Sequence, residues 1–108
     1  MLFWPRSAER SNRTIGKGKS ADGRTLVLVE WVDSHSGAGG WQPRDEIAGA
    51  AEPVYCRSVG WVVSERNGTM VLVSHVSGER NKGVRRYAKG DIAIPKKAVV
   101  NVSVLRGA

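Results

Sequence analysis

The stretch of sequence that decides the fold is residues 56–76, CRSVGWVVSERNGTMVLVSHV. Apolar residues repeat with period two on both sides of its centre: Val59, Trp61 and Val63 before it, Val71 and Val73 after it. Between them stands Asn67-Gly68, and an Asn-Gly pair flanked by such runs is the strongest short-range hairpin signal, because both residues tolerate positive φ. The stretch therefore predicts a β-hairpin with its turn at Asn67-Gly68 and with Trp61 on the buried face.

Length and composition indicate one small globular domain. The chain has 108 residues, 41% of them hydrophobic, and four Trp. No apolar run approaches the ~20 residues of a membrane span, and the first four residues are too short for the core of a signal peptide. The single Cys56 cannot form an internal disulfide, which is typical of a reducing compartment. We therefore expect a cytoplasmic protein that neither spans nor binds a membrane.

The net charge of +7 is unevenly distributed along the chain. Residues 1–24 carry +4, residues 25–77 carry −3, and residues 78–108 carry +6. Two basic segments flanking an acidic middle favour a polyanionic partner, usually nucleic acid. The alternative is that the charge serves solubility alone.

The distribution of apolar and polar residues divides the chain into an N-terminal arm and a domain that contains the hairpin. Residues 1–24 are polar and basic and predict a flexible N-terminal arm, with residues 5–23 flexible in the free protein. Residues 25–108 form the domain, which begins with a β-branched strand over 25–33. A Gly-rich loop follows, and Trp41 is expected to anchor the chain back onto the domain. Pro43, Asp45 and Glu46 then favour a short helix near 43–50.

The C-terminal third predicts a polar loop and two more strands. The loop runs over 78–90, a short extended segment over 91–95, and a valine-rich strand over 98–105. This makes about five short strands and one short helix. A sheet of so many short strands must close or nearly close in order to remove its exposed edges. The predicted fold is mainly β, a small, strongly bent antiparallel β-barrel of the SH3/Sm type.

Three segments carry a resemblance to Sm-like (LSm or Hfq-type) barrels. Gly60-Trp61-Val62-Val63 and Met70-Val71-Leu72-Val73 look like the two middle strands of such barrels. The segment from Ile94 to Val100, with its basic pair before an apolar run, resembles their 3₁₀ turn and final strand. The resemblance implies the barrel fold, and it raises ring-like homo-oligomers and RNA binding as expectations.

A second resemblance covers the chain from about Val29 to Leu105. It is carried by four motifs, Trp31-Val32-Asp33-Ser34, Gly40-Trp41, Ser58-Val59-Gly60-Trp61 and Ile94-Pro95-Lys96. Together they look like a family of small proteins encoded by phages and prophages. That family supplies no activity, but the likeness implies a viral accessory role in the host cell cytoplasm.

Residues that usually carry catalysis or metals are scattered. His35, His75, Cys56 and Asp33 show no paired metal-ligand spacing. Cys56 and His75 would have to meet across the hairpin to act as nucleophile and base. Asp33-Ser34-His35 has the residues of a catalytic triad, but adjacent residues rarely adopt its geometry, so we expect it to cap a loop. We therefore predict no enzymatic activity, no metal site and no cofactor.

The candidate binding residues lie in the basic C-terminal third. We predict that RNA or DNA is bound by Arg80, Lys82, Arg85, Arg86, Tyr87, Lys89, Lys96 and Lys97. Lys and Arg neutralise phosphates and Tyr stacks on a base, whereas Trp31, Trp41 and Trp61 are expected to pack in the core. The rival interpretation is a protein-interaction or structural module that binds a host or virion protein through Trp4 or an edge strand.

Overall fold

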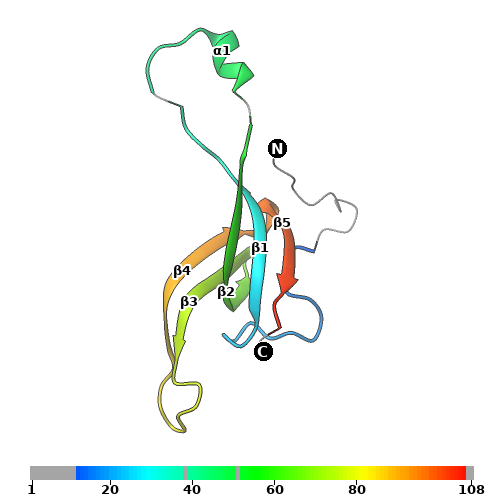
Figure 1. Cartoon of the computed structure of the whole chain (residues 1–108), viewed down its shortest axis with the longest axis vertical. Coiled ribbons are helices and arrows are strands. Elements are labelled where there is room, and N and C mark those ends of the chain that lie inside the picture. Colours follow the sequence, from blue (N-terminus) through cyan, green and yellow to red (C-terminus); the bar gives the residue numbers. More distant parts are fainter. Residues whose placement is uncertain (1–11, 38, 51, 107–108) are drawn as a thin grey trace.

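The computed structural model describes residues 12–37, 39–50 and 52–106. Within them the chain forms five strands: β1 (Leu26–Asp33), β2 (Val54–Arg66), β3 (Thr69–Ser77), β4 (Tyr87–Pro95) and β5 (Val99–Val104) (Figure 1). One short helix, α1 (Arg44–Gly49), lies between β1 and β2, and a 3₁₀ turn, η2 (Lys96–Ala98), joins β4 to β5. The predicted mainly β fold with a helix near residues 43–50 is confirmed.

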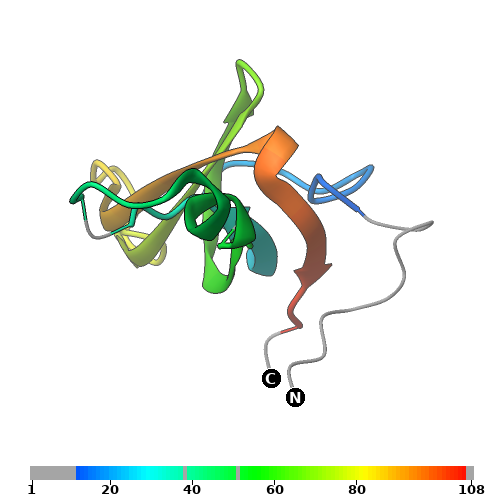
Figure 2. The same cartoon turned by 90° about the horizontal axis from the view of Figure 1, so that it is seen from above.

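All five strands belong to one antiparallel sheet with the order β4-β3-β2-β1-β5. β4 and β5 are its two edges and share no ladder in the described residues. Seen from above, β4 turns through η2 directly into β5 (Figure 2). The sheet is strongly bent but open, so closure into a barrel, which we expected from the number of short strands, is not seen.

The central hairpin turns where the sequence predicts. β2 ends at Arg66, β3 begins at Thr69, and the two turn residues have positive φ, 56° for Asn67 and 64° for Gly68. This is the backbone of a type I′ turn, which matches the right-handed twist of the two strands.

The buried face of β2 is the opposite of the predicted one. Val62 is fully buried, whereas Trp61 is half-buried and Val59 is 56% exposed. Gly60 shares the buried face, where a Cβ would lie 2.8 Å from the backbone oxygen of Val73. The prediction of the buried face was wrong because residues 59–63 are apolar or Gly at every position. Both faces of this segment are therefore apolar, and a period of two alone does not determine which one is buried.

The core gathers residues from every strand and from the segment before β1. Its buried members are Ile15, Val27, Val29, Val62, Met70, Leu72, Ile94, Val99 and Val102. Ile15 also donates its backbone N–H to the Glu65 carboxylate at 3.4 Å, and the N–H of Gly23 donates to Val62 O at 2.8 Å. The described part of the predicted arm thus contacts the sheet, while residues 1–11 lie outside the described residues. The flexibility of 5–23 stays a prediction.

Two bulges and one glycine bend the sheet. The β1–β5 register shifts at Glu30–Trp31, where β5 contributes the extra residue Val100, and the β2–β3 register shifts between Val62 and Ser64, where β2 contributes the extra residue Val63. Such bulges bend a strand and increase its twist. Between them, Gly60 lets β3 approach β2 closely. Because the sheet is bent, its apolar side chains pack against one another in one core, although the described residues form only one sheet.

Replacing Gly60 with alanine is expected to destabilise the fold by about 1–3 kcal/mol, because the new methyl group meets a backbone oxygen that cannot move freely. Gly40→Ala is the matched control, since no atom lies within 4 Å of a Cβ there. Its free energy of unfolding should change by less than about 0.5 kcal/mol. Urea denaturation of both variants measures the difference, and equal stabilities would show that β2 and β3 are not so close.

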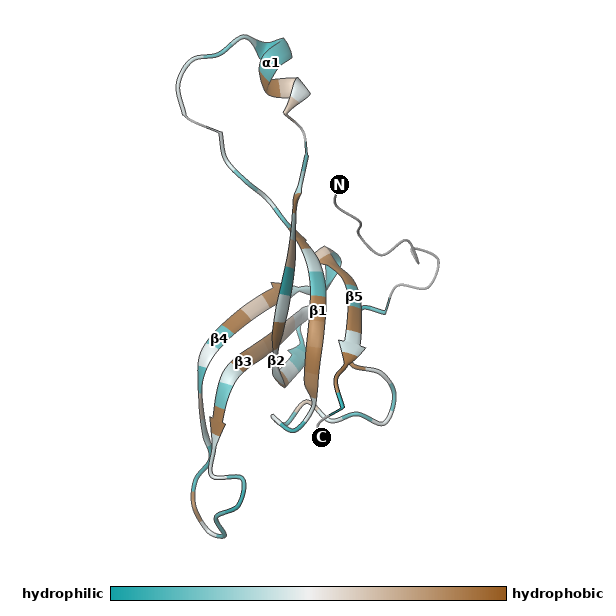
Figure 3. Ribbon diagram, viewed as in Figure 1, coloured by the Kyte–Doolittle hydropathy of each residue, from teal (hydrophilic) through white to brown (hydrophobic). Residues whose placement is uncertain are grey.

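The outer halves of the strands form two ribbons that leave the core at opposite ends of the molecule (Figure 1). The β1–β2 ribbon carries a long loop and α1, and the β3–β4 ribbon carries the loop 78–86. The molecule consequently measures 61 × 32 × 28 Å. Hydropathy follows this division, with apolar residues concentrated in the middle of the sheet and mostly hydrophilic residues in the β3–β4 loop (Figure 3).

The end of the β1–β2 ribbon corrects another prediction. Trp41 was expected to anchor the loop onto the domain, but it is fully exposed, and no residue of α1 is buried. The reason is that β1 and β2 continue their ladder to the pair Asp33–Val54, which carries the loop beyond the reach of the core.

Neither helical segment of the described chain has the length and apolarity needed to cross a membrane.

Candidate nucleic-acid interface

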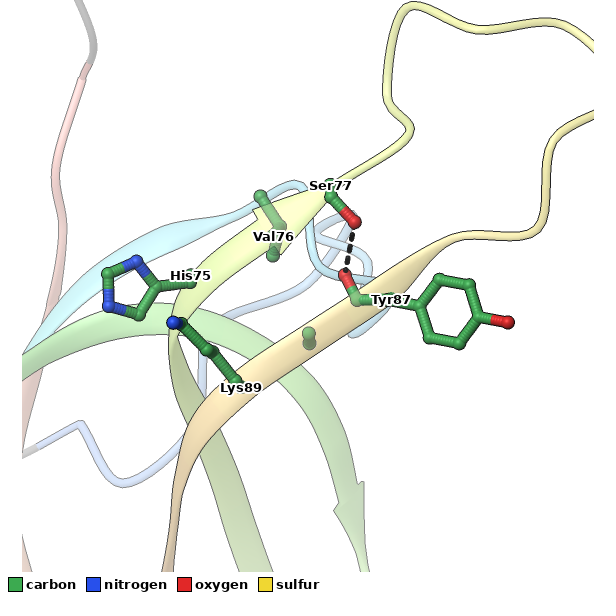
Figure 4. Close-up of a pocket in the computed structure, with 6 residues that line it drawn as sticks. His75, Val76, Ser77, Tyr87 and Lys89 are labelled. Atoms are coloured by element: carbon green, nitrogen blue, oxygen red, sulfur yellow. Dashed lines mark hydrogen bonds between the residues drawn. The ribbon is translucent and has the colours of Figure 1, made fainter.

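The β3–β4 ribbon supplies an exposed, two-stranded platform. Beyond the core, Ser74, His75 and Ser77 of β3 are exposed, as are all five residues of β4 from 87 to 91. The ladder pairs His75 with Lys89 and Ser77 with Tyr87, and the Ser77 hydroxyl donates to Tyr87 O at 3.5 Å (Figure 4). Backbone pairing therefore holds this ribbon although neither strand is buried there.

Basic side chains concentrate at the end of this ribbon, which we call the ribbon tip (residues 78–89). It holds five cations against the single acid Glu79, and all five cations are exposed: Arg80, Lys82, Arg85, Arg86 and Lys89. Arg86 lies 3.5 Å from Glu79 in an ion pair. The other four form no ion pair with a described residue, so their charge is available to a ligand.

Arg24 joins this cluster from a distant part of the sequence. Its guanidinium lies 4.0 Å from Glu79 and 3.7 Å from Asp22. Sequence reasoning missed it, because it placed Arg24 in the N-terminal arm and nothing in the local pattern relates that arm to the β3–β4 loop. Glu79 is therefore shared between two arginines, Arg24 and Arg86.

Tyr87 lies beside the cations and is 64% exposed. The Arg85 guanidinium lies over its ring, 5.9 Å from the centroid, and Figure 4 shows the ring pointing away from the ribbon. A shallow hollow of about 260 Å³ adjoins it, lined by His75, Val76, Ser77, Tyr87, Ala88 and Lys89. An exposed ring flanked by cations is an arrangement on which a nucleobase can stack.

Two of the predicted residues lie elsewhere. Lys96 and Lys97 belong to η2, which follows the far end of the nine-residue β4. At about 3.3 Å per residue, the seven residue steps from Lys89 to Lys96 span up to roughly 23 Å, so β4 separates the lysine pair from the ribbon tip. Lys96 lies 3.6 Å from Glu65 in an ion pair, whereas Lys97 is exposed. The predicted site thus divides into a ribbon-tip cluster of six residues and a separate lysine pair.

The candidate catalytic residues are not brought together. Cys56 lies on β2 opposite Trp31 of β1, and His75 lies on β3 opposite Lys89 of β4. Because β2 and β3 pair only between residues 61 and 73, these two residues belong to different ribbons. No group of three metal-ligating side chains occurs in the part of the chain that the structure describes.

Asp33 and His35 close the long loop, as the sequence predicts. The Asp33 carboxylate accepts a hydrogen bond from the Ser34 backbone N–H at 2.8 Å. His35 Nε2 lies 2.8 Å from Glu52 O, which ties the two ends of the loop together. Both contacts join side chains of this segment to backbone groups of the loop.

The tryptophans divide between packing and exposure. Trp31 contacts the core cluster, and its indole N–H donates to Ser58 Oγ at 3.0 Å. Trp31 and Trp61 are both half-buried, which leaves Trp41 as the exposed one among the three that the structure describes.

Comparison with known protein families, with curated proteins and with solved structures finds no match to this chain.

Proposed function

We propose that this protein is a non-catalytic nucleic-acid-binding module that contacts phosphates through the ribbon tip. The observation that supports it best is the presence of four exposed cations without an ion-pair partner among the described residues, beside the exposed ring of Tyr87. Lys and Arg side chains that neutralise phosphates release condensed counterions, and this release supplies most of the affinity in sequence-independent binding. Few phosphates are reached, so the binding is weak and strongly dependent on salt.

The shape of the ribbon agrees with this role. A two-stranded β-ribbon fits the major groove of B-DNA, which is about 12 Å wide, and its loop reaches a single strand as readily. The ribbon offers mainly cations and one aromatic ring, so it reads charge and stacking more than base sequence. RNA and DNA, single-stranded or duplex, are all candidate ligands.

The wider setting follows from the resemblances. We take the bent sheet as an open form of the small SH3/Sm-type barrels; support comes from its strand order and from the passage of β4 through η2 into β5. The likeness to phage-encoded proteins suggests an accessory protein that works in the cytoplasm of a host cell.

Hydrogen–deuterium exchange with and without a short oligonucleotide tests where the ligand binds. In low salt we expect added protection over residues 78–91 and none over residues 34–53, because the acidic loop repels phosphate. The amides of the exposed loop residues 79–86 are expected to exchange fast in the free protein, which would make their protection easy to detect. Protection at η2 alone would assign binding to the lysine pair instead.

A protein-interaction module is the second candidate, and the exposure of Trp41 favours it. A fully exposed Trp on an unpacked loop is a typical anchor for a partner protein. This function does not require the ribbon tip to bind phosphate, and the two functions are compatible in one chain because they use opposite ends.

A further inference from the structure

The end of the β1–β2 ribbon exposes an apolar surface that this chain leaves uncovered. We call its described residues, 33–37, 39–50 and 52–53, the arm tip; it is separate from the predicted N-terminal arm of residues 1–24. In the arm tip Trp41 is fully exposed and Ile47 is 54% exposed, and α1 buries none of its residues. Ile47 lines an open hollow of about 490 Å³ between α1 and the loop. Large apolar side chains left exposed on a projecting loop favour a contact surface.

The charge of the arm tip is opposite to that of the ribbon tip. The arm tip carries four acids, Asp33, Asp45, Glu46 and Glu52, against Arg44 alone. The ribbon tip carries five cations against Glu79 and also exposes apolar side chains, with Val84 at 54% and Tyr87 at 64%. Each end thus presents apolar groups within a field of one sign, and the two signs are complementary.

We propose that the arm tip of one copy docks onto the ribbon tip of a second copy. The two tips lie at opposite ends of a molecule 61 Å long (Figure 1), so they do not meet within one chain. Trp41 packs in the hollow beside Tyr87, while the acids of α1 face Arg80, Lys82 and Arg85. A second copy is the occupant that the charges favour, because it supplies both an apolar hollow and the opposite charge.

The contact joins different surfaces of the two copies, and this determines the assembly. Such a head-to-tail contact leaves one free arm tip and one free ribbon tip, so it continues into chains or closes into rings. Both tips are narrow, which places the buried area at the low end of specific interfaces and the affinity in the weak, reversible range. Nucleic acid competes for the same cations and is expected to dissociate the assembly.

Sedimentation velocity of the full chain, without nucleic acid, tests the contact. In low salt we expect the weight-average sedimentation coefficient to rise with protein concentration, and the rise to vanish in high salt. Asp45→Lys/Glu46→Lys and Arg85→Glu/Arg86→Glu should each sediment as monomers. An equimolar mixture of the two should associate again, because each reversed tip then meets a tip of opposite sign. Misfolding cannot produce this recovery.

Arg66→Glu/Lys97→Glu is the matched control for the ribbon-tip variant. It changes the net charge by the same amount at two exposed positions outside both tips, so it should associate like the wild type. A wild type that stays monomeric at high concentration in low salt would overturn the proposal, as would a ribbon-tip variant that associates unchanged or a mixture that fails to recover. Trp41→Ser should lose association without any change of charge.

The readout separates this inference from the proposed function. Self-association is measured without nucleic acid, and nucleic-acid binding is measured at protein concentrations too low for association. Absence of self-association would therefore not contradict nucleic-acid binding, and absence of nucleic-acid binding would not contradict self-association.

Discussion

Replacing Arg85 and Arg86 with alanine is expected to flatten the salt dependence of nucleic-acid binding. Each phosphate contact contributes about −0.9 to the slope of log K against log salt for duplex DNA and about −0.7 for single strands. Removing two contacts should therefore reduce the slope by about 1.8 for duplex and about 1.4 for single strands. Fluorescence anisotropy with labelled oligonucleotides at several salt concentrations measures both slopes.

The control is Lys96→Ala/Lys97→Ala, which removes the same charge from η2. The Lys96–Glu65 pair is more buried than the exposed Arg86–Glu79 pair, and both lysines lie most of a strand's length from the ribbon tip, so the slope should stay close to that of the wild type. The melting temperature of the Arg85/Arg86 variant should hardly change, because the Arg86–Glu79 pair is exposed and such pairs contribute about 0–1 kcal/mol. Equal effects of both variants on the slope would mean that binding depends on total charge and has no defined surface.

Val62→Ala should destabilise the protein far more than Val59→Ala, although the two valines lie three residues apart on β2. Val62 is fully buried and Val59 is 56% exposed. Truncating a buried valine removes two carbon groups at ~0.8 kcal/mol each and leaves a cavity that adds to the loss, so we expect about 2 kcal/mol. In a domain of this size that lowers the melting temperature by roughly 8 °C or more.

Calorimetry of the two valine variants decides which face of β2 is the core. Val59→Ala is expected within about 0.5 kcal/mol of the wild type. If Val59→Ala were the more damaging variant, the alternation of Val59, Trp61 and Val63 would mark the core after all, and the register of β2 would be wrong by one residue.

The hairpin was predictable because its signal is local. Asn67-Gly68 needs only the two flanking strands to determine the turn, and positive φ at both residues is a property of the residues themselves. The buried face of β2 was not predictable, because it depends on which side Gly60 meets β3. The open sheet likewise depends on the distance between β4 and β5, which no short pattern encodes.

The candidate site was predictable in composition and only partly in geometry. The cations of the 78–90 loop follow from the sequence, and the structure brings six of the eight predicted residues together. Lys96 and Lys97 are close to the loop in sequence but separated by an extended strand, which spans more distance per residue than any other element. Arg24 is remote in sequence and adjacent in space. Trp41 was assigned to the core by residue type alone, and the extended ladder that carries it outward was not considered.

Titration of labelled single-stranded and duplex DNA and RNA with the full-length wild-type protein, at low and at moderate salt, tests the central claim most directly. We expect weak binding of all four ligands in low salt, little preference for base sequence, and a slope that corresponds to about three to five phosphates, roughly −2 to −4.5. Absence of binding even in low salt would contradict nucleic-acid binding by the ribbon tip.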